Sequence, residues 1–169
     1  LFQLGDPQGE LQLRCSIAAY LHQARAVEAD PEQIVVGAGN DFLLLLLCSL
    51  FGTGQTIAME SPTYKKAYDL FRNLSNQVRI VEMDESGMRV DLLEQTDARV
   101  AYVMPSHQFP LGKVMPVGRR MQLLAWAAAK EDRYIIEDDY DSEFRYKGKP
   151  IPALQGYDRA ERVIYIGTF

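Results

Sequence analysis

A cluster of carboxylates and aromatic rings follows an apolar stretch near the end of the chain. Residues 135–146 read IIEDDYDSEFRY. The apolar start is typical of a buried strand, and ligands of open α/β sheets gather outside the carboxyl ends of the strands. Acids at this position could bind a hard cation such as magnesium. Alternatively, one carboxylate could pair with a protonated heterocyclic nitrogen of a cofactor.

Two glycines lie between a predicted strand and a predicted helix. Residues 35–41 read VVGAGND. Free backbone N–H groups at the start of a helix could bind a phosphate group. The segment is not a dinucleotide fingerprint, because Phe42 occupies the third glycine position. The alternative is a tight turn in which Asn40 or Asp41 caps the helix.

Two further polar loops follow predicted strands. The first, ESPTY at 60–64, places Tyr64 on the first turn of a helix, where its ring could cover a flat ligand or could simply pack. The second, PSHQFPLG at 105–112, has two prolines and a glycine that favour an irregular loop. His107 in this loop could serve a site or be structural, whereas His22 lies on a predicted water-facing helix.

Helical and strand patterns alternate along the chain. This alternation predicts an α/β fold with a mostly parallel sheet and helices on both faces. Helices are predicted at 13–25, 42–50, 63–74, 90–95 and 117–130, and strands at 33–36, 56–59, 77–81, 99–104, 133–137 and 162–166.

The composition predicts one soluble globular domain. The 169 residues are 47% hydrophobic and 24% charged. The net charge of -5 disfavours binding of this segment to a nucleic-acid backbone, and the apolar run 42–51 is shorter than the ~20 residues that a membrane span needs. Cys15 and Cys48 are predicted to be free, buried thiols. Free thiols are typical of a reducing compartment, and the sequence shows no signal-peptide pattern, so a cytoplasmic protein is expected.

The strand-end motifs, in their order, resemble the aminotransferase-like domain of MocR-type transcriptional regulators of the GntR family. This domain belongs to the fold type I pyridoxal-phosphate superfamily. The resemblance covers residues 5–169 and rests most on the acidic run and on the ending Gly167-Thr168-Phe169. It implies that the chain is part of the large domain of such a protein and that pyridoxal 5'-phosphate is the cofactor.

The resemblance also implies contacts to the cofactor ring. Asp138 would pair with the pyridinium nitrogen, and Tyr140 would bond to the ring hydroxyl. Tyr64 would stack on the ring. The loop of His107 and Gln108 would supply a polar contact to the ring hydroxyl. The resemblance does not indicate which of the two side chains makes this contact.

The cofactor phosphate would be held by residues from two segments: Ala38, Gly39 and Asn40, and Thr168. The chain departs from the family at two positions. Ala38 stands where Ser or Thr is common, and Leu111 stands where Thr or Ser is usual. The remaining acids of the cluster, Asp139, Asp141 and Glu143, are expected to be structural or surface residues.

In the family, Gly-Thr-Phe is followed by Ser-Lys, whose lysine forms the Schiff base with the cofactor. The resemblance therefore places the catalytic lysine beyond Phe169, and the small C-terminal domain and N-terminal DNA-binding domain outside the chain, which is expected to be inactive alone. The parent is expected to be a homodimer that binds an amino compound or 2-oxo acid. It would contact DNA only through the missing domain and would not contact a membrane.

Two alternatives remain open. The parent could be a genuine class I/II aminotransferase that transfers an amino group to a 2-oxo acid, with Asp138 keeping the cofactor ring cationic. The chain could also be a metal-dependent α/β enzyme that uses Asp138, Asp139 and Asp141. The metal reading leaves the Tyr64 and His107 segments unexplained.

Overall fold

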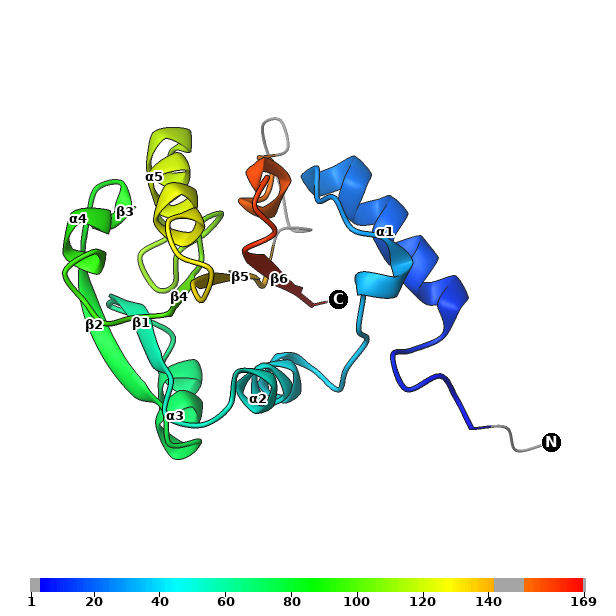
Figure 1. Ribbon diagram of the computed structural model, residues 1–169. Coiled ribbons are helices and arrows are strands. Elements are labelled where there is room, and N and C mark those ends of the chain that lie inside the picture. Colours follow the sequence, from blue (N-terminus) through cyan, green and yellow to red (C-terminus); the bar gives the residue numbers. More distant parts are fainter. Residues whose placement is uncertain (1–3, 142–150, 169) are drawn as a thin grey trace.

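A mostly parallel sheet forms the centre of the computed structural model, which describes residues 4–141 and 151–168. The strand order is β3-β2-β1-β4-β5-β6 (Figure 1). Among these strands, only β3 is antiparallel to its neighbour. The predicted α/β fold class is therefore confirmed. The bounds are β1 Thr56–Ser61, β2 Gln77–Asp84, β3 Gly87–Met88, β4 Val100–Val103, β5 Tyr134–Asp139 and β6 Val163–Gly167.

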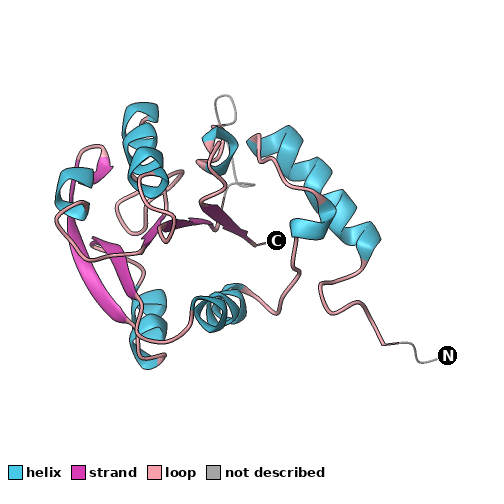
Figure 2. Ribbon diagram, viewed as in Figure 1, coloured by secondary structure: helices cyan, strands magenta, loops and turns pink. Residues whose placement is uncertain are grey.

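Helices cover both faces of the sheet, as predicted. Figures 1 and 2 show α2 and α3 on one face, α4 and α5 on the other, and α1 beyond the β6 end. The α-helices are α1 Leu11–Arg25, α2 Asn40–Phe51, α3 Lys65–Asn73, α4 Val90–Leu93 and α5 Val117–Ala128, and two 3₁₀ turns are η1 Pro31–Gln33 and η2 Gln155–Tyr157.

Alternate residues of the central strands face the two helical layers. In β4, Val100 and Tyr102 pack in the cluster that includes α2 and α3, whereas Ala101 and Val103 pack in the cluster that includes α4 and α5. All four residues are buried because both faces of the sheet are covered. This two-sided burial explains why the strands read as continuous apolar runs in the sequence.

The predicted strand at 33–36 is wrong. Gln33 ends the turn η1, and although Ile34 has extended dihedral angles, no strand of the described residues pairs with it. The backbone N–H of Val36 instead donates to Gln8 O at 2.8 Å. An extended segment becomes a strand only when a neighbouring strand supplies its hydrogen bonds. The local sequence pattern does not show whether such a neighbour is present.

The two cysteines differ in their surroundings. Cys48 is buried in α2, but Cys15 is exposed on α1, so the prediction of two buried thiols is wrong for Cys15. Among residues 4–141 and 151–168, no helix is long and apolar enough to cross a membrane.

A buried ion pair connects α1 with the sheet. Arg25, the last residue of α1, donates from Nε to Asp139 Oδ2 at 2.8 Å and from a terminal nitrogen to Ser106 Oγ at 2.6 Å. The hydroxyl of Tyr165 donates to the same oxygen of Asp139 at 2.6 Å. Both charged side chains are almost fully buried, so each depends on the other for neutralisation. Asp139 therefore serves to hold α1 against β5 and β6.

We expect Arg25→Met to lower the free energy of unfolding by about 3–5 kcal/mol, because the Asp139 carboxylate would lose its cation while buried. Urea unfolding followed by circular dichroism measures this loss. The control is Arg79→Met, which breaks the exposed pair of Arg79 with Asp97 and should change the stability far less. Equal losses in the two variants would contradict this role of the buried pair.

Candidate functional site

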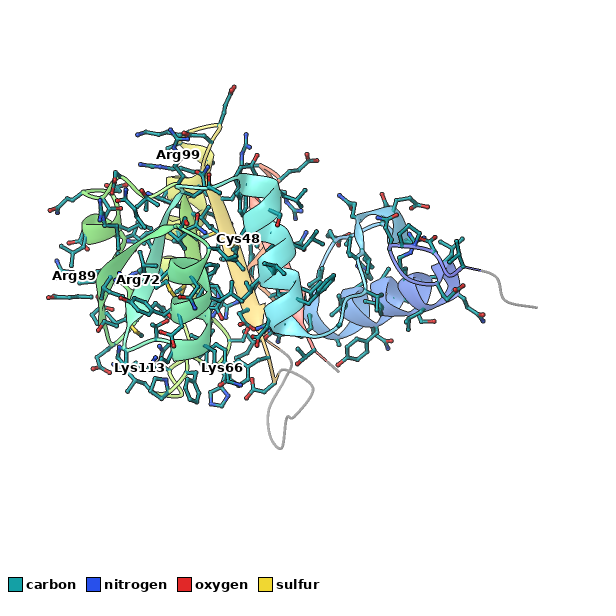
Figure 3. The ribbon with its side chains drawn as sticks, turned by 90° about the horizontal axis from the view of Figure 1, so that it is seen from below. Cys48, Lys66, Arg72, Arg89, Arg99 and Lys113 are labelled. Carbon is teal, nitrogen blue, oxygen red and sulfur yellow. The ribbon has the colours of Figure 1, made fainter. Side chains whose placement is uncertain are left out.

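The predicted site residues lie at one edge of the sheet, where the parallel strands have their carboxyl ends. Figure 3 shows Arg99, which precedes β4, at one edge, and Lys66 and Lys113, which follow β1 and β4, at the opposite edge. The motifs that end β1, β4, β5 and β6 lie at this second edge because these strands are parallel.

Asp138 lies at the end of β5 and is 3% exposed. Its Oδ2 accepts hydrogen bonds from the hydroxyl of Tyr102 and, at 2.9 Å, from Nδ2 of Asn40. Its Oδ1 is buried and has no hydrogen-bond partner among the described residues. Burial raises the pKa of Asp138, and the two hydrogen bonds oppose this rise. The carboxylate thus has one oxygen bound by the protein and one buried oxygen that lacks a donor among the described residues.

Aromatic rings from three loops pack together near this edge. The ring of Phe109 meets Tyr64 edge to face at 5.9 Å between centroids and Tyr140 at 6.5 Å. The His107 ring is stacked on Tyr140 at 5.9 Å, and its Nδ1 forms an ion pair with Asp141. Tyr64 precedes α3 at the N-cap position rather than lying in its first turn. The structure therefore places Tyr64, His107 and Tyr140 in one group of rings, in which Phe109 contacts both Tyr64 and Tyr140.

Gln108 joins two of the site loops. The side chain is 2% exposed, and its Nε2 donates to the carbonyl oxygens of Pro62 and Phe109, both at 2.8 Å. Its Oε1 accepts from the backbone N–H of Leu111 at 3.2 Å. Both amide protons are therefore used within the loops. Of the two polar side chains predicted here, His107 is the more accessible, since its side chain is 50% exposed.

The start of α2 is open. Gly39 occupies the N-cap position with φ 92°, and no side chain caps the helix, so the alternative in which Asn40 or Asp41 is the cap is wrong. A Cβ atom built on Gly39 would meet nothing within 4 Å. Gly39 and Thr168 line the same groove of about 490 Å³, and the Thr168 hydroxyl donates to the carbonyl oxygen of Tyr140 at 3.2 Å. Backbone N–H groups at this helix start are therefore accessible to an anion.

Two buried polar residues at the site were missed from the sequence, Tyr102 and Glu60. Tyr102 lies in a strand whose apolar neighbours predicted a plain core. Glu60 was predicted to begin a polar loop, but it lies within β1. Glu60 is 1% exposed, its Oε2 has no partner among the described residues, and burial raises its pKa to about 7. The usable signal for Glu60 was a carboxylate at the carboxyl end of an apolar strand, which is one part of the signal that drew attention to the acidic run of Asp138.

The structure does not support the metal-dependent alternative. No group of three His, Cys, Asp or Glu side chains suited to a metal ion occurs in the part of the chain that is described. The three aspartates of that alternative have separate partners, because Asp138 binds Tyr102 and Asn40, Asp139 binds Arg25, and Asp141 binds His107. Glu143 lies outside the described residues.

Comparisons with known proteins agree with the motif-based resemblance. The family model for aminotransferase class I and II matches residues 1–169. An uncharacterized HTH-type transcriptional regulator of Bacillus subtilis, YdeL, is 45% identical over 169 residues, which are 100% of this chain and 36% of that protein. The probable rhizopine catabolism regulatory protein MocR of Rhizobium meliloti is 37% identical over 162 residues, or 95% of this chain and 33% of that protein.

A solved structure supports the same relationship. The crystal structure of an archaeal alanine:glyoxylate aminotransferase superposes with a TM-score of 0.87 at 35% identity, over 98% of this chain and 43% of that one. The resemblance to MocR-type regulators and the fold type I architecture are thus confirmed. The chain spans about a third of the length of the regulators that it matches.

We expect Glu60→Gln to remove part of the pH dependence of stability. Because the folded-state pKa of Glu60 is raised from 4.5 to about 7, the neutral acid stabilises the fold at low pH. This contribution, up to about 3 kcal/mol, is lost as the pH rises through about 7. Urea unfolding between mildly acidic and mildly alkaline pH should show wild type losing stability relative to Glu60→Gln.

The matched control for this experiment is Glu82→Gln, which makes the same change at an exposed position of β2. It should follow the wild-type pH profile. A Glu60→Gln profile that also follows wild type would contradict the raised pKa of Glu60.

Proposed function

The chain belongs to the class I and II aminotransferase family, and on this basis we propose that it forms part of a pyridoxal-phosphate site in the effector domain of a MocR-type transcriptional regulator. Proteins of this family generally use pyridoxal phosphate. The matches to an HTH-type transcriptional regulator at 45% identity and to the probable regulatory protein MocR at 37% identity support the regulatory assignment.

The observation that carries the proposal is the unpaired Oδ1 of Asp138. Leaving a buried acceptor without a donor is costly, and the cost is greater when the acceptor is charged. A protonated ring nitrogen would supply both a donor and a positive charge at this oxygen. The pairing would favour the ionised form of Asp138 against the effect of burial, and it would favour the protonated form of the ring.

Other residues of the chain fit the remaining parts of the cofactor. The phosphate would bind at the open start of α2, where the backbone N–H groups of Ala38, Gly39 and Asn40 would donate to it and the helix dipole is positive. Thr168 lies in the same groove as Gly39 and adds a hydroxyl. These contacts fix one end of the cofactor while Asp138 fixes the other.

The aromatic and polar side chains orient the ring between these ends. Burial raises the pKa of Tyr140, so its phenol keeps its proton at neutral pH and can donate to the ring hydroxyl oxygen. Tyr64 would cover the ring, and its side chain packs edge to face against Phe109. His107 offers a polar contact, and Gln108 keeps the loops of Tyr64 and His107 in place.

Bound pyridoxal phosphate supplies an electron sink for reactions at the α-carbon of an amino compound. In this proposal the chain is the first part of an aminotransferase-like domain, residues 1–169. The covalently binding lysine, the small C-terminal domain and an N-terminal DNA-binding domain belong to the rest of the longer protein. That protein is a cytoplasmic homodimer that senses an amino compound or a 2-oxo acid and binds DNA through its N-terminal domain.

A genuine aminotransferase is the second candidate. The 35% identity and TM-score of 0.87 to a solved aminotransferase favour it. Both candidates use the same contacts to the cofactor within this chain. The two candidates differ in whether the longer protein contains a DNA-binding domain, and the HTH-type relatives YdeL and YhdI of Bacillus subtilis favour the regulator.

We expect Asp138→Ala to weaken pyridoxal-phosphate binding at least roughly tenfold in a longer protein that contains this chain and the family's lysine, because a charge-assisted hydrogen bond to the ring nitrogen is lost. Absorbance titration with the cofactor measures the affinity, and added chelators should not change it. The control is Asp91→Ala, which removes an exposed aspartate of α4. Unaltered binding in Asp138→Ala would reject the assignment.

A further inference from the structure

We propose that Tyr102 and Asn40 are positioning residues that hold the Asp138 carboxylate by one oxygen and thereby aim the other oxygen at a protonated ring nitrogen. The identity of the ligand rests on the proposed function. The arrangement of the three side chains does not, because it is present in the chain itself.

Tyr102 reaches Asp138 along one face of the sheet. In the register of β4 and β5, Tyr102 pairs with Ile136, and Asp138 lies two residues further on the same face. The Tyr102 side chain is fully buried, and its ring meets Phe71 of α3 edge to face at 5.6 Å. Packing therefore prevents the ring from turning away, so the hydroxyl is held at Asp138 Oδ2.

Asn40 reaches the same oxygen from a different element. It is the first residue of α2, and its Nδ2 donates to Asp138 Oδ2 at 2.9 Å. The other amide atom, Oδ1, is buried without a partner among the described residues. The opposite orientation of the amide would place this oxygen against a carboxylate, so the charge of Asp138 selects the donating orientation. Asn40 thus links the open start of α2 to the acid in β5.

Two donors on one oxygen fix the rotation of the carboxylate group. A single hydrogen bond would let the group turn about its Cβ–Cγ bond, whereas donors from β4 and α2 define the position of Oδ2 from two directions. Oδ1 is then the oxygen left for a ligand. Preorganising an acceptor in this way avoids the cost of ordering it when the ligand binds.

The charges around the site keep Tyr102 in the donating form. Burial and the nearby Asp138 raise the pKa of Tyr102 well above its usual value, and Tyr64 and Glu60 act in the same direction. The pKa of Asp138 is raised by burial and by the neighbouring Asp139 and Asp141. The hydrogen bonds from Tyr102 and Asn40 oppose that rise, so removing either donor should raise the pKa of Asp138 further.

The test is a pH titration of the Asp138 side-chain carboxyl by 13C NMR in the labelled chain, without any cofactor. We expect the titration midpoint of Asp138 to shift upward in Tyr102→Phe and in Asn40→Ala. The control is Tyr134→Phe, which makes the same chemical change at the start of β5. The Tyr134 hydroxyl accepts from Arg162 at 3.3 Å, so this variant should leave the midpoint in place.

The two substitutions act from different elements, so failure of one variant to fold still leaves the other as a test. If the titration midpoint of Asp138 is unchanged in every one of these two variants that folds, the positioning role is wrong. The cofactor assignment is tested separately by the affinity of Asp138→Ala. If the titration midpoint of Asp138 shifts but Asp138→Ala binds pyridoxal phosphate normally, the positioning role is supported and the assignment of the cofactor as the ligand of Asp138 is wrong.

Discussion

Burial of three consecutive carboxylates at the end of β5 constrains the elements around them. Glu137, Asp138 and Asp139 are each 3% exposed or less. Because side chains alternate along a strand, Asp138 faces the layer of α2, and its two neighbours face the opposite side. Each carboxylate then needs its own partners, since an unpaired buried charge is costly.

The partners come from distant parts of the chain. The oxygens of Glu137 accept the backbone N–H groups of Leu154 and Gln155 at 2.7 and 2.9 Å. Asp139 binds Arg25, which holds α1 against the sheet. Asp138 receives donors from β4 and from the start of α2 and keeps one oxygen unpaired. Asp139 also has a buried oxygen, Oδ1, without a partner among the described residues, but its charge is neutralised by Arg25. Of the three acids, Asp138 is the one whose side chain bonds to the first residue of α2.

The sequence was sufficient to predict the helices and strands that follow hydrophobic periodicity, and the acidic strand end followed from the abrupt change from IIE to DDYD. It was not sufficient to predict which charges pair. In the sequence, Arg25 is only the last residue of a predicted helix, and its partner Asp139 is 114 residues away. Tyr102 read as part of an apolar strand because a phenol packs like a hydrophobic ring, and its hydroxyl is informative only when the register with β5 is known.

The most direct test of this account is the 15N NMR shift of the ring nitrogen of labelled pyridoxal phosphate bound to a protein that contains this chain. If the free oxygen of Asp138 receives the ring nitrogen, that nitrogen should remain protonated at mildly alkaline pH and show the shift of a pyridinium ion. A shift typical of an unprotonated pyridine nitrogen in the bound cofactor would contradict the central claim.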